Sequence, residues 1–471
     1  MELKKGLKVH LMGICGTGMA GLAGLLKSKG FVVTGSDQNM YPPMSEYIKH
    51  LKIPVMEGYS PNNLQHGPDL VIVGNVITRD NPEAQELLRL GLPYMSFPQA
   101  MKEFALKDKV SIVVSGTHGK TTTTSLISWI LFSAGMDPGY LVGGIPLNFH
   151  RNFNVGAGRY FVIEGDEYDT AFFDKRPKFL HYLPSIAVIT SVEFDHADIY
   201  KDYSHVLESF KALLSILPKE GLLILNGDIS DLKNELHQYS YKKLTYGLDP
   251  QDNYSLKNYS INGDFTQFNL AIEGKKYIFK TRLYGIHNLL NVLAAIAVSV
   301  NIGISMDEIY KALNSFLGVK RRQEVIGIVD NITVIDDFAH HPTAVRETIS
   351  AVKARFEPKR LIAVFEPRSN SSRRNVFQDI YPLSFQNAEV IAVPEPKNME
   401  KIPPDLRFSS VKLVGDLKEM GKDAFYFKDT LELMDFLLDF VSQGDVVLFM
   451  SNGDFENLPR KLFHKLVLTR L

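Results

Sequence analysis

Cysteine is almost absent from this sequence, which contains Cys15 alone among 471 residues. An intramolecular disulfide and a cysteine-rich zinc site are therefore both excluded. An excess of either charge is also lacking, because 52 lysines and arginines face 53 aspartates and glutamates and the formal net charge is −1. A chain that coats nucleic acid usually carries a basic excess, so we expect no nucleic-acid partner.

Long hydrophobic runs are missing as well. The longest apolar stretch lies near residues 292–300 and is too short and too interrupted to span a bilayer. The first six residues, MELKKG, lack the apolar run of a secretory signal peptide. Hydrophobic residues at 45% and charged residues at 22% are close to the averages of globular proteins, which excludes wholesale disorder. We expect a soluble, cytoplasmic protein without a membrane partner.

The chain does contain a recurring alternation of apolar runs, glycine-rich turns and helical patterns. Residues 8–14 form an apolar run that contains a glycine, and a helical pattern and a second apolar run follow through residue 34. This order predicts a βαβ unit. The pattern restarts at residue 110 and again beyond residue 318, which at this length predicts three α/β domains with mostly parallel sheets. The predicted domains cover residues 1–108, 109–318 and 319–471.

Two stretches depart from the parallel pattern. Between residues 253 and 284, apolar and polar residues alternate, which predicts an antiparallel insertion in the second region. Residues 325–329 and 332–335 are apolar runs separated by Asp330-Asn331, which predicts a hairpin at the start of the third region.

The segment SGTHGKTTTT at residues 115–124 is the most informative motif. It follows an apolar run and opens a helical pattern, so its glycines would let backbone N–H groups point at phosphate oxygens. Lys120 would reach the β- and γ-phosphates, and the Thr121 hydroxyl would bind magnesium. Val114 stands where the longer motif has its first glycine, so Gly116 gives a compressed loop. The alternative is an ordinary glycine-rich turn that contains a lysine.

Two acidic clusters also follow predicted strands. EGDEYD begins at Glu164, and EFDHAD covers residues 193–198 around His196. The carboxyl ends of strands are where ligands bind in open α/β sheets. Each cluster alone is more typical of a solvated loop, but a phosphate loop in the same sheet favours a magnesium site.

A glycine fingerprint, G-x-G-x-x-G, lies at residues 16–21, and Asp37 follows 16 residues beyond its last glycine. Read alone, this spacing is typical of an NAD-binding fold. The fingerprint therefore leaves open that the chain is an NAD-binding oxidoreductase or a regulatory nucleotide-binding module.

The motifs are joined by HNLLN at residues 287–291, RRQE at 321–324 and DDFAHHP at 336–342. In this order, the set resembles the Mur ligases, which are ATP-dependent amide-forming enzymes of peptidoglycan assembly. The resemblance covers essentially the whole chain. It implies a Rossmann-like UDP-binding first domain, a P-loop ATPase-type central domain and a Rossmann-like third domain. It also implies ATP and Mg²⁺ as cofactors.

Two activities within the family compete. One member joins L-alanine to UDP-N-acetylmuramate, and another joins the tripeptide L-alanyl-γ-D-glutamyl-meso-diaminopimelate to the same nucleotide sugar in peptidoglycan recycling. Residues 41–45, 167–178 and 366–370 resemble the tripeptide-using member. The L-alanine-using member typically has Pro-His-Arg-Tyr where this chain has PRSN at 367–370. The resemblance therefore favours the tripeptide, with L-alanine as the alternative.

The resemblance also implies roles for individual residues in ATP chemistry. Lys120, His196 and Arg322 would be catalytic, with Arg321 as the alternative to Arg322. Thr121, Glu164 and His196 would hold magnesium. The residues expected to bind ATP are Gly116, Thr117, His118, Gly119, Lys120, Thr121, Thr122, Asn288, Asn291, Arg322, Asp337, His340 and His341. Asn288 and Asn291 share one helix face, where amides can read adenine edges. Helix capping is the alternative for Asn288, and a metal site is the alternative for the histidine pair.

The other two substrates are assigned to the outer domains in the same way. The resemblance reassigns the glycine fingerprint from NAD to the UDP-sugar, which would be bound by Gly13, Cys15, Gly16, Thr17, Gly18, Ser36 and Asp37. Cys15 would serve there as a small packing residue. The murein tripeptide would meet Arg368, Ser369 and Asn370, because a planar guanidinium suits bidentate binding of a carboxylate. Lys211 falls at the spacing of the carbamoylated lysine of some Mur ligases, although an exposed helix lysine explains it equally well.

Overall fold

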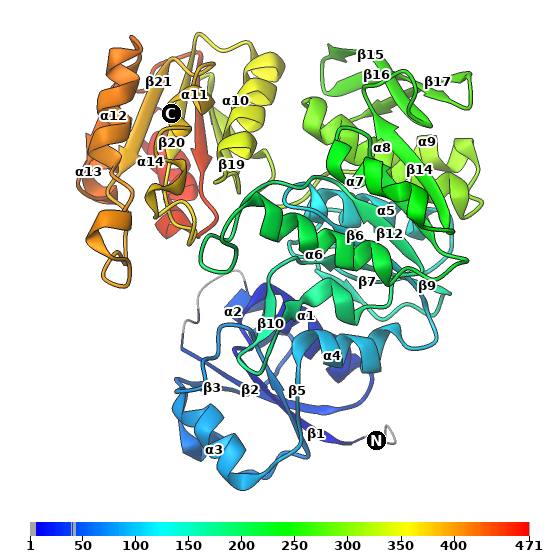
Figure 1. Ribbon diagram of the computed structural model, residues 1–471. Helices are drawn as coiled ribbons and strands as arrows, with labels where there is room; N and C mark the ends of the chain where they lie inside the picture. The colour runs from blue at the N-terminus through cyan, green and yellow to red at the C-terminus, as the bar shows by residue number, and fades with distance from the viewer. Residues whose placement is uncertain (1–5, 39, 41–43, 471) are drawn as a thin grey trace.

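The computed structural model describes residues 6–38, 40 and 44–470, so residues 41–43 of the segment at 41–45 lie outside the description. Three main sheets follow one another along the chain, and helices flank each of them (Figure 1). The predicted α/β class is confirmed. Within the described ranges, no helix is long and apolar enough to cross a membrane.

The first sheet has five parallel strands in the order β3–β2–β1–β4–β5. Its central strand β1 is joined to β2 through helix α1, which confirms the predicted βαβ unit. The strands are β1 (Lys8–Met12), β2 (Val32–Asp37), β3 (Val55–Glu57), β4 (Leu70–Val73) and β5 (Tyr94–Ser96). The helices are α1 (Thr17–Ser28), α2 (Met44–His50), α3 (Pro82–Leu90) and α4 (Phe97–Met101).

The central sheet has ten strands in the order β17–β16–β15–β14–β13–β12–β6–β9–β7–β8. Strand β6 lies in its parallel part and is buried on both faces, as a strand covered by helices must be. Val113 packs in the core beside α6, whereas Ile112 and Val114 pack against α5 and α8. The strands are β6 (Val110–Ser115), β7 (Gly139–Leu141), β8 (Phe153–Asn154), β9 (Tyr160–Gly165), β12 (Ile186–Ile189), β13 (Leu222–Asn226) and β14 (Lys242–Gly247). The helices are α5 (Lys120–Ser133), α6 (Tyr203–Ser215), α7 (Ser230–Glu235), α8 (Ile286–Asn301) and α9 (Met306–Ser315).

The edge of the central sheet is an antiparallel meander. Strands β15 (Tyr254–Asn262), β16 (Phe265–Ile272) and β17 (Lys275–Thr281) pair antiparallel, which confirms the predicted insertion. A separate two-stranded ribbon, β10 (Asp169–Ala171) and β11 (Asp174–Pro177), projects toward the first sheet (Figure 1). This ribbon directly follows the first acidic cluster.

The third sheet has six strands in the order β18–β19–β23–β20–β21–β22. Strands β18 and β19 form the predicted antiparallel hairpin, and the other pairs are parallel. The strands are β18 (Glu324–Val329), β19 (Ile332–Asp337), β20 (Arg360–Phe365), β21 (Val390–Pro394), β22 (Asp423–Phe427) and β23 (Asp445–Met450). The helices are α10 (Pro342–Phe356), α11 (Tyr381–Ser384), α12 (Ser410–Glu419), α13 (Thr430–Phe440) and α14 (Leu458–Arg470).

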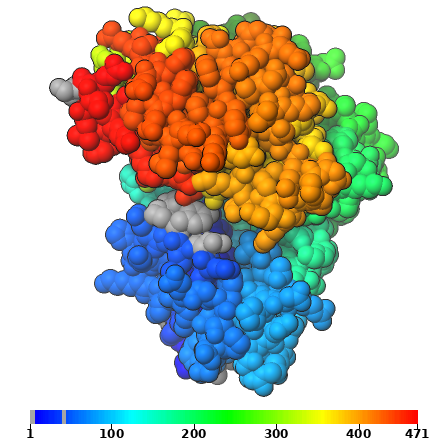
Figure 2. Space-filling model, turned by 90° about the vertical axis from the view of Figure 1, so that its left-hand side faces the viewer, coloured from blue at the N-terminus to red at the C-terminus, as the bar shows by residue number. Residues whose placement is uncertain are grey.

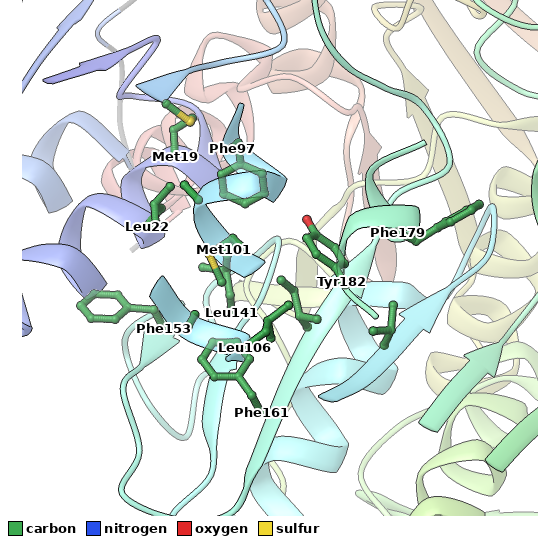
Figure 3. Packing of buried hydrophobic residues seen from close by; sticks show 14 of the residues in the cluster. Met19, Leu22, Phe97, Met101, Leu106, Leu141, Phe153, Phe161, Phe179 and Tyr182 are labelled. Carbon is green, nitrogen blue, oxygen red and sulfur yellow. The ribbon is translucent and has the colours of Figure 1, made fainter. Parts of the chain in front are cut away.

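The first and central regions share one apolar core. Met19 and Leu22 of α1 belong to one buried apolar cluster with Phe97 and Met101 of α4, and the same cluster includes Phe153 of β8 in the central region (Figure 3). A Cβ on Gly24 would lie 2.3 Å from a Phe153 ring carbon, and one on Gly21 would lie 2.3 Å from Leu141. Glycine therefore permits α1 to approach the central sheet closely.

The third region has its own two apolar clusters, one on each face of its sheet. In the view of Figure 2 this region, in yellow, orange and red, lies above the blue first region, with the green central region at the right. Hydrogen bonds join the third region to the central region, as where Ser371 donates to Asp195 and Thr343 donates to Glu193.

Candidate active site

One cleft of about 1520 Å³ is lined by side chains from all three regions. It lies at the carboxyl ends of β6, β9 and β12, where ligands bind in open α/β sheets. Thr17 from the first region, Lys120 from the central region and Arg368 from the third region all face it. A single bound assembly of substrates can therefore contact all three regions.

The phosphate loop connects β6 to α5 and rests on the segment after β12. The Ser191 carbonyl accepts the Thr117 N–H at 3.0 Å, and its hydroxyl accepts the His118 N–H at 2.8 Å. Gly116 has φ +140°, and a Cβ there would lie 2.1 Å from the Thr190 hydroxyl. A side chain cannot fit at this position, so the compressed loop requires glycine. The loop opens a 14-residue helix whose N-terminus favours anions.

Lys120 at the start of α5 is held by a buried carboxylate. Its Nζ lies 2.9 Å from Glu167 Oε2 and donates to the Gly116 carbonyl at 2.6 Å. Burial alone would lower the pKa of Lys120, but Glu167 and Asp166 raise it, so the ammonium stays charged. Burial would likewise raise the pKa of Glu167, but Lys120 and His196 hold it at about 2.

His196 contacts the other oxygen of the same carboxylate. Its Nε2 lies 3.2 Å from Glu167 Oε1, and this contact raises the pKa of His196 against the effect of burial. The residue has φ +53°, an uncommon conformation for a residue other than glycine. Strained backbone of this kind clusters at functional sites. Here the imidazole lies against Glu167, the carboxylate that also pairs with Lys120.

Glu164 ends β9 beside the first turn of α5. It accepts hydrogen bonds from the Thr121 hydroxyl at 3.1 Å and from the Gly143 N–H. Burial, followed by the nearby Asp166 carboxylate, raises the pKa of Glu164 to about 7. The ionised form of Glu164 is therefore disfavoured in this environment, and a bound cation would stabilise it. Its oxygen and the Thr121 hydroxyl are hard donors suited to Mg²⁺.

Arg322, rather than Arg321, reaches the phosphate loop from the linker after α9. Its Nη2 donates to the Thr121 hydroxyl at 3.3 Å, and its guanidinium lies 4.5 Å from the Phe338 ring centre. Arg321 instead donates to the Ser451 carbonyl at 2.6 Å within the third region. Burial lowers the pKa of Arg322, although Asp337 opposes this effect. A desolvated guanidinium is well suited to stabilise a transferred phosphoryl group.

The predicted adenine and ribose residues all belong to the lining of the cleft. Asn288 and Asn291 are buried on α8, and Asn291 Oδ1 accepts a hydrogen bond from the Thr123 hydroxyl at 3.2 Å. Asp337 ends β19 and accepts the Gln323 and Ala339 N–H groups, each at 2.7 Å. The bond from Gln323 holds the linker that carries Arg322 against the third sheet.

The two histidines after β19 point to different neighbours. His340 lines the cleft, with its Nε2 3.8 Å from Asp195. His341 caps α10 and faces Glu193 and His118 of the central region. Burial, and then the adjacent His118, lower the pKa of His341 to about 4. His341 lies outside the lining of the main cleft and faces a smaller hollow beside it.

The predicted UDP-sugar residues divide into two sets. Gly16, Thr17 and Gly18 line the cleft, whereas Gly13, Cys15, Ser36 and Asp37 are not among the lining residues. Asp37 supports the loop by accepting the Cys15 N–H at 2.8 Å. Burial, followed by the charge of Asp37, raises the pKa of the Cys15 thiol to about 11, which agrees with a packing role.

The predicted peptide residues follow β20 and all line the cleft. Arg368 forms an ion pair with Asp454 at 3.0 Å, and Asn370 donates to Asp198 of the central region at 2.8 Å. A Cβ on Gly453 would lie 2.1 Å from Arg368 Cδ, so this glycine makes room for the arginine. Lys211 lies outside the cleft lining and pairs with Glu208 and Glu235.

Three further residues at or beside the cleft were not singled out from the sequence. Glu167 belongs to an acidic cluster that the sequence did reveal, but nothing identified which carboxylate would meet Lys120. Ser371 donates to Asp195 at 2.6 Å and ties the third region to the second acidic cluster. Lys178 lies 3.2 Å from Asp166 and 4.0 Å from the Tyr168 ring centre, facing the cleft. Lys178 ends the segment at 167–178 that resembles the tripeptide-using member, but that resemblance gives Lys178 no role, and Ser371 lies just beyond the segment at 366–370.

Family models match the three regions in order. The model described as Mur ligase family, catalytic domain, matches residues 8–109. The Mur ligase middle domain matches residues 114–299, and the Mur ligase glutamate ligase domain matches residues 321–453.

Two curated relatives align with nearly the whole chain. The UDP-N-acetylmuramate–L-alanyl-γ-D-glutamyl-meso-2,6-diaminoheptandioate ligase of Escherichia coli is 37% identical over 458 residues, which cover 97% of this chain and 97% of the relative. The UDP-N-acetylmuramate–L-alanine ligase of Desulforamulus reducens is 33% identical over 473 residues, which cover 99% of each chain.

Two solved structures are similar over the same length. A murein peptide ligase from Psychrobacter arcticus is 34% identical with a TM-score of 0.76, covering 98% of this chain and 99% of that one. A UDP-N-acetylmuramate–alanine ligase from Thermotoga maritima is 25% identical with a TM-score of 0.81, covering 98% and 100%.

Proposed function

This chain belongs to the Mur ligase family, and from that premise we propose that it joins L-alanyl-γ-D-glutamyl-meso-diaminopimelate to UDP-N-acetylmuramate in peptidoglycan recycling. As a family member it is an ATP-dependent amide-forming ligase that acts on UDP-N-acetylmuramate, with a peptide or alanine as the second substrate. The observation that carries the choice of tripeptide is the 37% full-length identity to a ligase named for that substrate, against 33% for the alanine ligase.

The reaction proceeds through an acyl phosphate, as the family resemblance implies. A muramyl carboxylate oxygen bonds to the γ-phosphorus of ATP, and ADP leaves. The peptide amine then attacks the acyl carbon, and phosphate leaves. Lys120 and Arg322 are assigned to the transferred phosphoryl group, because phosphoryl transfer depends on positioning and on stabilising charge. The support for this assignment is that both cations converge on the first turn of α5.

Mg²⁺ at the nucleotide is assigned to the oxygen donors Thr121 and Glu164, and His196 is assigned to a second Mg²⁺. The raised pKa of Glu164 supports a cation at this point, because an ion would compensate the crowded carboxylates. When bound there, Mg²⁺ neutralises charge on the phosphates. Glu167 is assigned to keep Lys120 charged and to orient both Lys120 and the His196 imidazole, which gives up its proton when it binds an ion.

The remaining ATP contacts are assigned to the junction of the central and third regions. Asn288 and Asn291 are placed at the adenine, and Asp337 with His340 at the ribose. All four side chains line the same cleft, which supports this assignment. The UDP-sugar is assigned to the glycine loop at residues 16–18, which lines the same cleft as the phosphate loop.

The tripeptide is assigned to the third region, where Arg368 binds one of its carboxylates. Arg368 already forms an ion pair with Asp454, and a carboxylate ligand can replace or extend that pair through the guanidinium's free donors. Ser369 and Asn370 follow on the same loop and supply further hydrogen-bonding groups. L-Alanine has one carboxylate and a methyl group, so it would leave several of the polar groups of Arg368, Ser369 and Asn370 without a partner.

The alternative function is ligation of L-alanine, which the TM-score of 0.81 to an alanine ligase favours. Phosphate release can be measured with ATP, Mg²⁺ and UDP-N-acetylmuramate, adding either the tripeptide or L-alanine. Stimulation by the tripeptide alone is the expected result. Stimulation by L-alanine alone would refute the tripeptide assignment while leaving the ATP site intact. No stimulation of phosphate release by either compound would refute the assigned reaction itself.

A further inference from the structure

A second cluster of metal-ligating atoms lies beside the magnesium residues and is separate from them. It consists of His118 Nε2, Glu193 Oε2 and His341 Nδ1, which lie within 4.8 Å of one another. His118 comes from the phosphate loop, Glu193 follows β12, and His341 is the N-cap of α10. The cluster therefore joins the central region to the third region.

The spacing within the cluster suits a tetrahedral ion. Glu193 Oε2 lies 3.6 Å from His118 Nε2 and 3.5 Å from His341 Nδ1. A tetrahedral zinc ion with bonds of about 2.0–2.1 Å holds neighbouring ligand atoms roughly 3.4 Å apart. Neither histidine–carboxylate distance is short enough for a good hydrogen bond. Small side-chain rotations would bring all three atoms to an ion between them.

The hydrogen bonding of the two imidazoles agrees with metal ligation. His118 Nε2 is buried without a hydrogen-bond partner, which is costly for a polar atom unless something binds it. His341 Nε2 lies 3.1 Å from the Phe194 carbonyl, so it donates there and leaves Nδ1 as the basic nitrogen. A backbone carbonyl on the second nitrogen is one of the common outer partners of a metal-bound histidine.

Two contacts of Thr343 complete the surroundings. Its hydroxyl donates to Glu193 Oε2 at 2.6 Å and orients the carboxylate. Its N–H approaches His341 Nδ1 at 3.3 Å, a long hydrogen bond that an ion would replace. The adjacent Asp195 and His340 face each other at 3.8 Å and remain outside the cluster.

From this geometry we infer that His118, Glu193 and His341 form a site for Zn²⁺, or a similar late first-row cation, that fastens the third region to the phosphate loop. Two imidazoles and one carboxylate are the ligand set of zinc with an open fourth position. Mg²⁺ prefers oxygen ligands and octahedral geometry, so it would not compete effectively. The site does not depend on which substrate the enzyme uses.

Binding can be measured on the full chain with Zn²⁺ and a chromophoric chelator, in a large excess of Mg²⁺. We expect one Zn²⁺ per chain, and Co²⁺ in its place should give the visible absorption of a tetrahedral site. Glu193→Gln and His341→Gln should each weaken Zn²⁺ binding by more than the roughly 10–100-fold that loss of an outer partner costs. His464→Gln, at an exposed position on α14, is the matched control and should bind as the parent does.

Three outcomes would overturn the inference. These are no Zn²⁺ binding to the parent protein, unchanged binding in both variants, or stoichiometric displacement of Zn²⁺ by Mg²⁺. Circular dichroism of each variant checks that it is folded. Because Glu193→Gln keeps the shape of the side chain, it tests the site even if His341→Gln loses the cap of α10.

Discussion

The ion pair between Lys120 and Glu167 gives the most quantitative prediction. The Glu167 side chain is 2% exposed and the Lys120 side chain 12% exposed, so the pair is nearly removed from water. A pKa of about 2, against an ordinary 4.5, corresponds to about 3 kcal/mol of preference for the ionised carboxylate. Breaking a buried pair by removing one partner typically costs about 3–5 kcal/mol. Glu167→Gln should therefore lower the free energy of unfolding by about 3 kcal/mol at pH 7.

The pH dependence of this loss has a defined sign. Because the pKa of Glu167 is lower in the folded protein, its contribution is fully present above about pH 4.5 and disappears as the pH falls toward 2. Urea denaturation followed by circular dichroism should show a large difference between parent and variant at pH 7. The difference should shrink steadily over that acid range for as long as the parent remains folded.

A half-exposed pair provides the control for this experiment. Glu389 contacts Lys353 at 2.6 Å, but their side chains are 38% and 42% exposed. Glu389→Gln should cost less than about 1 kcal/mol, because solvent screens such pairs. Equal losses in the two variants, or a loss below 1 kcal/mol for Glu167→Gln, would refute the claim that the buried carboxylate organises the phosphate-loop lysine.

Four further predictions follow from the site and the core. Arg368→Ala should raise the KM for the tripeptide at least tenfold with little change in the KM for ATP, and an unchanged tripeptide KM would remove Arg368 from peptide binding. Arg322→Lys should lower kcat roughly 100-fold, measured as phosphate release, because lysine lacks the planar fork; near-normal kcat would contradict its role. Glu164→Gln should stabilise the metal-free protein at pH 8 by about 1–3 kcal/mol in urea denaturation. A carboxyl whose pKa is raised to about 7 in the folded protein destabilises the fold as the pH rises from 4.5 to 7. A destabilised variant would show that the ionised Glu164 carboxylate does not destabilise the fold. Gly24→Ala should destabilise the protein by about 1–3 kcal/mol, measured by thermal unfolding, because its Cβ would overlap Phe153; an unchanged Tm would mean that α1 can move away.

Local patterns in the sequence predicted most of the fold. Period-two alternation identified the antiparallel meander, and a two-residue turn identified the hairpin of β18 and β19, since both depend on neighbours in the chain. The close approach of α1 to β8 was not predictable in this way, because Gly24 and Phe153 are far apart in sequence. An isolated glycine in a helix does not reveal what it packs against.

The site shows the same division. The phosphate loop is a local motif, so its strand, turn and helix could be located from residues 110–133 alone. The choice of Glu167 as the partner of Lys120 depends on how β9 ends relative to α5, which the acidic cluster itself does not specify. His118 and His341 were both expected at the ATP site, but their direct contact depends on the placement of the third region and could not be derived from either motif.

The central claim, that this ligase uses the tripeptide, is tested most directly by competition in one reaction. ATP, Mg²⁺ and UDP-N-acetylmuramate are supplied with equal concentrations of the tripeptide and L-alanine, and the two nucleotide products are separated and counted by mass spectrometry. The product ratio then equals the ratio of kcat/KM for the two nucleophiles. The account predicts that UDP-N-acetylmuramyl-tripeptide will dominate by at least 100-fold. A mixture dominated by UDP-N-acetylmuramyl-L-alanine would contradict it.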